Sequence, residues 1–377
     1  MKTIGMKIKG FLPVLLVWVM ATGCIYEKND NFGRLQNVLI QVNVSSEEVT
    51  KSVAAEADAA EDAINSIRIY AFYNNQLSGH YFRATASAEP IVMDLQLPLS
   101  GTHNVDFYVI ANENAISGAQ GSPAIGEYTS QDQLRQICIG GLVNPHQNGL
   151  PLYYNEVVGI NVDNLSADKA SDIHPGHFWL VQQLDADLKR PVSKVAVYVA
   201  EVEPGSAVYE TTVPKLTVTG IDIQNASSTG YLFDANDATE LGNTPYTIDT
   251  DVNVVNVIGE QNGNAVADSE NYTLVMEPRY FFENSKGSSQ WSSGYFETQP
   301  ELDQISQGAM VLKIGYSFDG GTSSSYAYVK MPQIEKNVFY KVMCRFSPVG
   351  GHQEVLITIN EWNYITHTYD EVTVKSK

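Results

Sequence analysis

Apolar and polar residues alternate along several short stretches of this sequence, and that two-residue period constrains the fold more than any other feature. Val38, Ile40, Val42 and Val44 occupy every second position of the first stretch. The same period recurs over residues 67–73, 105–110, 192–199 and 355–359. Because successive side chains of a strand point to opposite faces, the pattern indicates half-buried β-strands. We therefore predict an all-β chain with few short helices.

The first 23 residues have the pattern of a signal peptide and are left out of the expected fold. Positively charged residues precede an apolar run over residues 11–20, which is about half as long as a membrane span. Small residues follow, ending in Gly23-Cys24. This ending predicts cleavage between Gly23 and Cys24 and attachment of lipid, such as palmitate, to Cys24. The alternative is an ordinary signal peptide with a cysteine nearby.

Chain length favours two folded domains. Removing the signal peptide leaves 354 residues (377 − 23), more than one small sandwich holds. A loop at 174–177 precedes a new long strand, so we place the boundary near 180. We expect a lipidated propeptide with the first strand over 24–51, an N-terminal domain over 52–180 and a C-terminal domain over 181–377. Both are predicted to be antiparallel β-sandwiches of a transthyretin-like or Greek-key kind.

A few stretches depart from the strand pattern. Residues 52–64 are rich in Ala, Glu and Asp without an apolar stripe, which predicts an exposed linker. Residues 130–137 predict a short helix capped by Ser130. Asparagine-rich clusters predict turns at 74–75 and 112–114.

Charge and motif content argue against several function classes. Lys and Arg number 23 against 43 Asp and Glu, and the resulting charge of −20 repels nucleic-acid phosphates. Besides Cys24, the chain has Cys138 and Cys344, which we expect as two separate thiols in preference to a disulfide. His174 and His177 flank Pro-Gly and lack a third ligand nearby. We expect no metal, no cofactor and no enzymatic activity, since no catalytic motif occurs.

Several segments, in this order, resemble the fimbrillin superfamily, whose members build type V pili. They are the lipobox at Cys24 followed by the strand 38–44, the strand and turn 67–75, Ile110-Ala111-Asn112, residues 188–195, and residues 357–362. Together they span most of the chain. The resemblance implies a surface-exposed lipoprotein of the cell outer membrane. Its implied partners are other fimbrial subunits and a host or bacterial surface receptor.

The resemblance also implies a route of maturation. In such pili a trypsin-like protease cuts after the first strand, which leaves with the lipid and exposes a groove. The position that matches the cut is Lys51-Ser52, where cleaved family members usually carry Arg. The displaced strand would be the one that carries Val38, Ile40, Val42 and Val44. The alternative is that Lys51 is one more solvated lysine.

The C-terminal tail over 363–377 is the candidate donor strand. Its alternating residues are Tyr364, Thr366, Thr368, Val372 and Val374. The resemblance implies that such a tail fills the groove of another subunit by β-augmentation. The alternative is an ordinary last strand of its own domain.

The expected function is a structural subunit, of the stalk, in a type V-like fimbrium that supports adhesion. The alternatives are an anchor or tip subunit of the same pilus, or a surface lipoprotein that binds glycans without polymerising. For the last, Trp179, Trp291 and Trp362 could form an aromatic platform, although buried positions are the simpler expectation.

Overall fold

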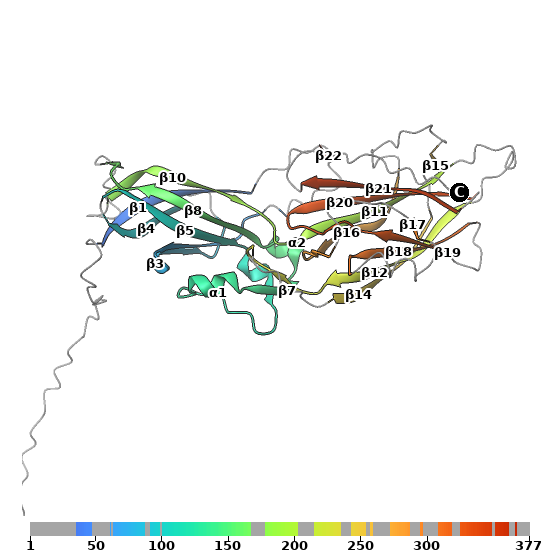
Figure 1. Cartoon of the computed structure of the whole chain (residues 1–377), viewed down its shortest axis with the longest axis horizontal. Coiled ribbons are helices and arrows are strands. Elements are labelled where there is room, and N and C mark those ends of the chain that lie inside the picture. Colours follow the sequence, from blue (N-terminus) through green and yellow to red (C-terminus); the bar gives the residue numbers. More distant parts are fainter. Residues whose placement is uncertain are drawn as a thin grey trace, which may run out of the picture.

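The computed structural model describes residues 35–46, 61, 63–86, 91–98, 100–166, 178–202, 215–234, 243–253, 257–258, 272–286, 295–296, 308–318, 325–348, 351–361 and 366–367. Figure 1 draws two regions of β-structure along the long axis of the molecule. β1 to β5 and β8 to β10 build the region at the left, and β11, β12 and β14 to β22 build the region at the right. Among the described residues, no helix has the length and apolarity needed to cross a membrane.

The first region is a sandwich of two sheets. One sheet has the order β4 (Ile91–Pro98), β1 (Leu35–Ser46), β10 (Phe178–Leu188), β9 (Leu165–Ser166). The other has the order β3 (Gln76–Arg83), β2 (Ile67–Tyr73), β5 (Thr102–Ala111), β8 (Leu152–Asn161). Their facing side chains form one core, to which Ile40, Leu95, Ile69 and Phe107 belong. Burial of alternate side chains from both sheets is what the two-residue period predicts.

The second region is also a sandwich. One sheet runs β15 (Val257–Ile258), β11 (Ser193–Val202), β20 (Val338–Ser347), β21 (Gly351–Glu361), β22 (Thr366–His367), with β16 (Thr273–Phe281) also paired to β11. The other runs β14 (Asn243–Asn253), β12 (Leu216–Ser227), β18 (Val311–Phe318), β19 (Ser325–Lys330), β17 (Tyr295–Phe296). Val197, Val342, Ile221 and Ile314 lie in the core between them. The all-β sandwich fold expected from the sequence is confirmed.

Strand direction differs in part from the antiparallel expectation. Most pairs are antiparallel, but β1 runs parallel to β10, and β11 runs parallel to β20 and β15. The two sandwiches share one arrangement. β1 lies between antiparallel β4 and parallel β10, and β11 lies between antiparallel β16 and parallel β20. The first strand of each sandwich therefore occupies an equivalent inner position.

An apolar layer joins the two regions. It contains side chains from the outer face of the β2–β5 sheet, from α1 (Gln131–Arg135) and from β7 (Cys138–Leu142), packed with Leu232, Phe233 and Phe282. A small sheet of order β13 (Gly230–Tyr231), β7, β6 (Ile116–Gly118) also crosses the junction. Short helices lie on this side, namely η1 (Glu113–Ala115) and α2 (Pro145–Asn148) in addition to α1.

The expected domain boundary at residue 180 falls inside β10. This strand is continuous to Leu188, and Leu184, Ala186 and Leu188 all lie in the first core. The chain reaches the second sandwich at β11, whose residues are buried on both faces. The change from one sandwich to the other therefore lies between Leu188 and Ser193.

Three local features agree with the sequence: the turn at Asn74-Asn75, the cap of α1 and the separate thiols. Asn74 and Asn75 have φ of 50° and 61° and form the tight turn between β2 and β3. Ser130 caps α1 in a capping box: its hydroxyl accepts from the backbone N–H of Gln133, whose side chain accepts from the backbone N–H of Ser130. The two thiols, Cys138 and Cys344, are separate, as expected.

Candidate functional site

The first described strand, β1, lies inside its sheet rather than at an edge. Residues 35–42 pair antiparallel with β4, and residues 38–46 pair parallel with β10, with an irregularity between Leu39 and Gln41. Hydrogen-bonded neighbours therefore flank β1 on both sides. We call the place between β4 and β10 that this strand fills the β1 position.

The inward face of β1 carries the four side chains expected from the alternation. Val38, Ile40 and Val42 are at most 2% exposed, and Val44 packs half-buried against the same core. Burying an aliphatic side chain of this kind contributes about 1.5–3 kcal/mol. Any strand that takes the β1 position must bring a comparable apolar face. Leu39, on the opposite face, is also buried, which the alternation does not predict.

The outward face of β1 is linked to β10 by a ladder of polar side chains. The Asn43 amide donates to Asp185 Oδ1 at 2.7 Å and to Gln183 Oε1 at 3.0 Å, and the Ser45 hydroxyl donates to Asp187 Oδ1 at 2.6 Å. Gln41 Nε2 donates to Asn43 Oδ1 at 3.0 Å. We call this set of side chains the polar ladder. It pairs donors on β1 with carboxylates on β10.

The chain after β1 is fixed to the second sandwich at Glu61. Lys194 Nζ on β11 donates to both Glu61 carboxylate oxygens, at 2.9 and 3.0 Å, and the Tyr280 hydroxyl of β16 donates to Oε1 at 2.5 Å. Both side chains of the ion pair are less than 10% exposed. The prediction that residues 52–64 form an exposed linker is therefore wrong at Glu61, which is buried between the sandwiches.

Asn112 holds the residues that follow Glu61. Its side-chain amide donates to the carbonyls of Ala63 and Leu150, both at 2.7 Å, and its Oδ1 accepts from the backbone N–H of Asn65 at 2.8 Å. Asn112 has φ of 57° and is 1% exposed. Gly149 must be glycine here: its φ is 76°, and a Cβ would lie 2.6 Å from Asn112 Nδ2. We call residues 61–66 the anchor segment.

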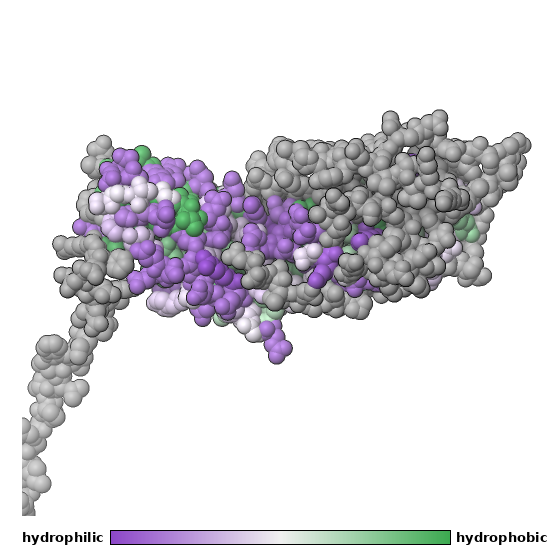
Figure 2. Space-filling model, in the orientation of Figure 1, coloured by the Kyte–Doolittle hydropathy of each residue, from purple (hydrophilic) through white to green (hydrophobic). Residues whose placement is uncertain are grey.

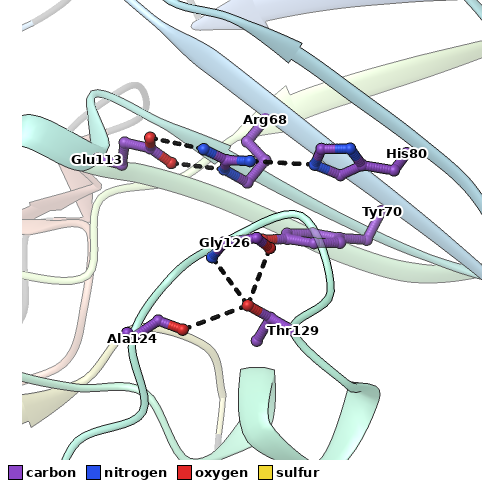
Figure 3. A network of polar contacts seen from close by, with 7 residues as sticks. All are labelled: Arg68, Tyr70, His80, Glu113, Ala124, Gly126 and Thr129. Carbon is purple, nitrogen blue, oxygen red and sulfur yellow. Dashed lines mark hydrogen bonds and ion pairs between the residues drawn. The ribbon is translucent and has the colours of Figure 1, made fainter. Parts of the chain in front are cut away.

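Arg68, the first arginine after the expected cut, lies in β2 and is shielded. It is 8% exposed, and its guanidinium donates to both Glu113 oxygens, at 2.7 and 2.9 Å (Figure 3). The opposite side of the guanidinium faces His80 Nε2 at 3.1 Å. Burial and the neighbouring Arg68 charge lower the pKa of His80, which favours a neutral ring that accepts this hydrogen bond.

A loop closes over the same face of β2. The Tyr70 hydroxyl donates to the carbonyl of Gly126 at 2.6 Å, and the Thr129 hydroxyl lies 2.9 Å from that carbonyl and 3.2 Å from the carbonyl of Ala124 (Figure 3). These contacts hold the loop ahead of α1 against the sheet. A protease that binds extended chain therefore finds no free segment around Arg68.

Most residues of the predicted sites fall beyond the described ranges. These are Gly23, Cys24, Lys51, Ser52, Tyr364, Thr368, Val372 and Val374. His174, His177, Trp291 and Trp362 also lie outside the described residues. Thr366 is described and belongs to β22, whose backbone pairs with β21 at Asn360. Trp179 is half-buried in β10. Among the residues that the structure describes, no group of three or more His, Cys, Asp or Glu residues could hold a metal ion.

Sequence reasoning missed the polar ladder and the anchor segment. The alternation Leu184-Asp185-Ala186-Asp187-Leu188 is a strand signal that could have located β10 and placed both carboxylates on one face. For Glu61 no such signal exists, because the acidic residues of the linker look alike and Lys194 lies 133 positions away.

Comparison with solved structures finds fimbrial and adhesion proteins of low sequence identity among the similar chains. No protein-family model matches the sequence, and no curated protein does. A solved structure of a proposed cell adhesion protein from Parabacteroides distasonis has 11% identity and a TM-score of 0.49, covering 89% of this chain and 98% of its own. Fimbrilin FimA from Porphyromonas gingivalis has 13% identity and a TM-score of 0.49, covering 86% and 97%.

The tip fimbrial protein Mfa3 from the same species, with a C-terminal truncation, has 14% identity and a TM-score of 0.44, covering 87% of this chain and 100% of its own. Two of the three bear the names of fimbrial proteins, and the third that of a proposed cell adhesion protein. Identities at this level concern the fold alone.

Proposed function

We propose that this chain is a pilus subunit, exported as an outer-membrane lipoprotein on Cys24, whose first strand is removed by proteolysis and replaced by a strand of another subunit. The observation that carries the proposal is the β1 position. A strand at the start of the described chain fills the middle of a sheet, and 14 residues (47–60) separate its end at Ser46 from Glu61. One cut in that interval would free β1 from the rest of the protein.

Removing β1 would leave unpaired strand edges and exposed apolar surface, which favour the binding of a replacement strand. The facing edges of β4 and β10 would lose their backbone partners, and the core around Leu95 and Phe107 would lose the apolar side chains that cover it. Unpaired edges and exposed apolar surface of this kind drive strand pairing between chains. A strand from a second subunit satisfies both demands at once by β-augmentation.

The anchor segment would hold the new N-terminus after the cut. A cut at Lys51-Ser52 lies ten residues before Glu61, which Lys194 and Tyr280 bind between the two sandwiches. The remaining chain is therefore tied at the junction while β1 departs. This division into a removable strand and a fixed continuation is what a maturing subunit needs.

The C-terminal tail would supply the replacement strand. Since Thr366 and His367 pair with β21 of their own sandwich, the donor is most simply the part of the tail beyond them, with Val372 and Val374 as its apolar side chains. A stalk subunit requires both a removable strand and a donor. An anchor subunit of the pilus would keep β1, and a tip subunit would need no donor strand.

Limited digestion with trypsin tests the proposed maturation. Protein lacking residues 1–34, and with them Lys28 and Arg34, is expected to be cut first after Lys51, releasing a fragment of residues 35–51, because Arg68 is buried and bound to Glu113. Fragment masses followed over time identify the first site. Lys51→Gln, the matched control, is expected to lose that early cut. A first cut elsewhere, at equal rate in the variant, would contradict the proposal.

A further inference from the structure

The polar ladder adds side-chain hydrogen bonds on the outward face of β1, which an apolar groove alone does not explain. Asp185 and Asp187 of β10 are exposed on one face of the sheet, and each carboxylate accepts a hydrogen bond from β1, at 2.7 Å from Asn43 and 2.6 Å from Ser45. The donors belong to the strand that the proposed function removes. The acceptors stay with the subunit.

We propose that Asp185 and Asp187 select the strand that enters the β1 position: it is a segment of a second copy of this chain that carries hydrogen-bond donors or cations at two alternate outward positions. The inference rests on the proposed function and adds the chemistry by which the position recognises its occupant. The core beneath the β1 position selects a strand with apolar inward side chains, and the two carboxylates select donors or cations on the outward face of that strand.

Charge supports this division of roles. Once β1 leaves, two carboxylates two residues apart on one strand lie about 6.5–7 Å from each other, with no donor from the neighbouring strand. Directly opposed like charges across strands are destabilising, and opposite charges or donors are favourable. An entering strand with Asp or Glu at the outward positions is therefore disfavoured, especially in a chain of net charge −20.

The tail of the same chain contains the required pattern. Val42-Asn43-Val44-Ser45 of β1 alternates inward valines with outward donors, and Val372-Thr373-Val374-Lys375 has the same alternation. In this register Thr373 and Lys375 take the places of Asn43 and Ser45 opposite the two aspartates. The match ends at Asp370, which in this register would fall at the place of the buried Ile40, so the tail is proposed to fill only the end of the β1 position from Val42 onward, where the carboxylates lie.

Peptide exchange tests the selection. Trypsin-cut protein is mixed with excess fluorescent peptide of residues 35–46, and bound peptide is measured by anisotropy. Changing Asn43→Val and Ser45→Val together is expected to weaken binding about three- to tenfold, since two donors to carboxylates are lost at a solvent-exposed face. Changing both to Lys is expected to keep or increase affinity, and added salt should weaken that binding most.

The matched protein carries Asp185→Ala and Asp187→Ala. On it the original, valine and lysine peptides are expected to bind with similar affinity, which assigns the differences to the two carboxylates. If the original peptide rebinds and all three peptides bind wild-type protein alike, selection by the aspartates is overturned and strand exchange stands. If no peptide binds, strand exchange itself fails, and the selection fails with it.

Discussion

Replacing Lys194 with methionine is expected to lower the free energy of unfolding by about 3–5 kcal/mol, because it leaves the buried Glu61 carboxylate without its cation. The ammonium group donates to both carboxylate oxygens, and both side chains are less than 10% exposed. Methionine keeps most of the volume of lysine, so the lost charge accounts for the effect. Urea unfolding of the two proteins measures the difference.

Two controls separate this effect from the general loss of a lysine. Lys313→Met breaks a partly exposed pair with Asp222 at 3.5 Å and is expected to cost less than about 1 kcal/mol. The double change Glu61→Leu with Lys194→Met removes both charges and is expected to recover most of the loss. Equal costs for Lys194→Met and Lys313→Met would mean that Glu61 is not held as described.

Replacing Ile40 with aspartate is expected to destabilise uncut protein by roughly 4 kcal/mol or more, because it places an unpaired charge in an apolar core. Ile40 is fully buried between the two sheets of the first sandwich. The same protein is then cleaved and mixed with wild-type peptide 35–46. It is expected to unfold at the same temperature as wild-type protein that has been cleaved and mixed with the same peptide, because the altered strand is no longer present. Thermal unfolding before and after exchange measures both effects.

The matched control lies at the equivalent place in the second sandwich. Val197 on β11 is fully buried in the second core, and β11 occupies the same position between an antiparallel and a parallel neighbour. Val197→Asp should destabilise the protein similarly, and cleavage with added peptide should not restore it. If Ile40→Asp prevents folding, Ile40→Ala, with an expected cost of about 2–5 kcal/mol, serves instead. Failure of either Ile40 variant to recover would argue that β1 is not replaced.

Local features of this fold follow from the sequence because their causes are local. The span of β2 and the α1 cap were predicted at their places, and so was the turn at Asn74-Asn75. Alternation also identified the inward residues of β1. In each case the deciding interactions lie within a few residues of one another. They are the alternation of side chains along a strand, the helix cap, and the left-handed backbone conformation of asparagines in a turn.

What the sequence did not predict depends on partners far along the chain. The parallel pairing of β1 with β10 joins residues about 140 positions apart, as the Asn43–Gln183 contact illustrates. Burial of Glu61 requires Lys194 and Tyr280, which no local pattern connects to it. The boundary near 180 was drawn at a loop, whereas the first core extends to Leu188 because β10 completes its sheet.

The size of the cleaved protein tests the central claim, that a strand of one subunit replaces β1 of another, most directly. Sedimentation would compare uncut protein, protein cut after Lys51, and cut protein lacking residues 368–377, which keeps β22 in its own sheet. We expect monomers for the uncut chain, head-to-tail polymers for the cut chain, and no polymers without residues 368–377. Cut protein that stays monomeric, or that polymerises equally without residues 368–377, would contradict strand replacement by the tail.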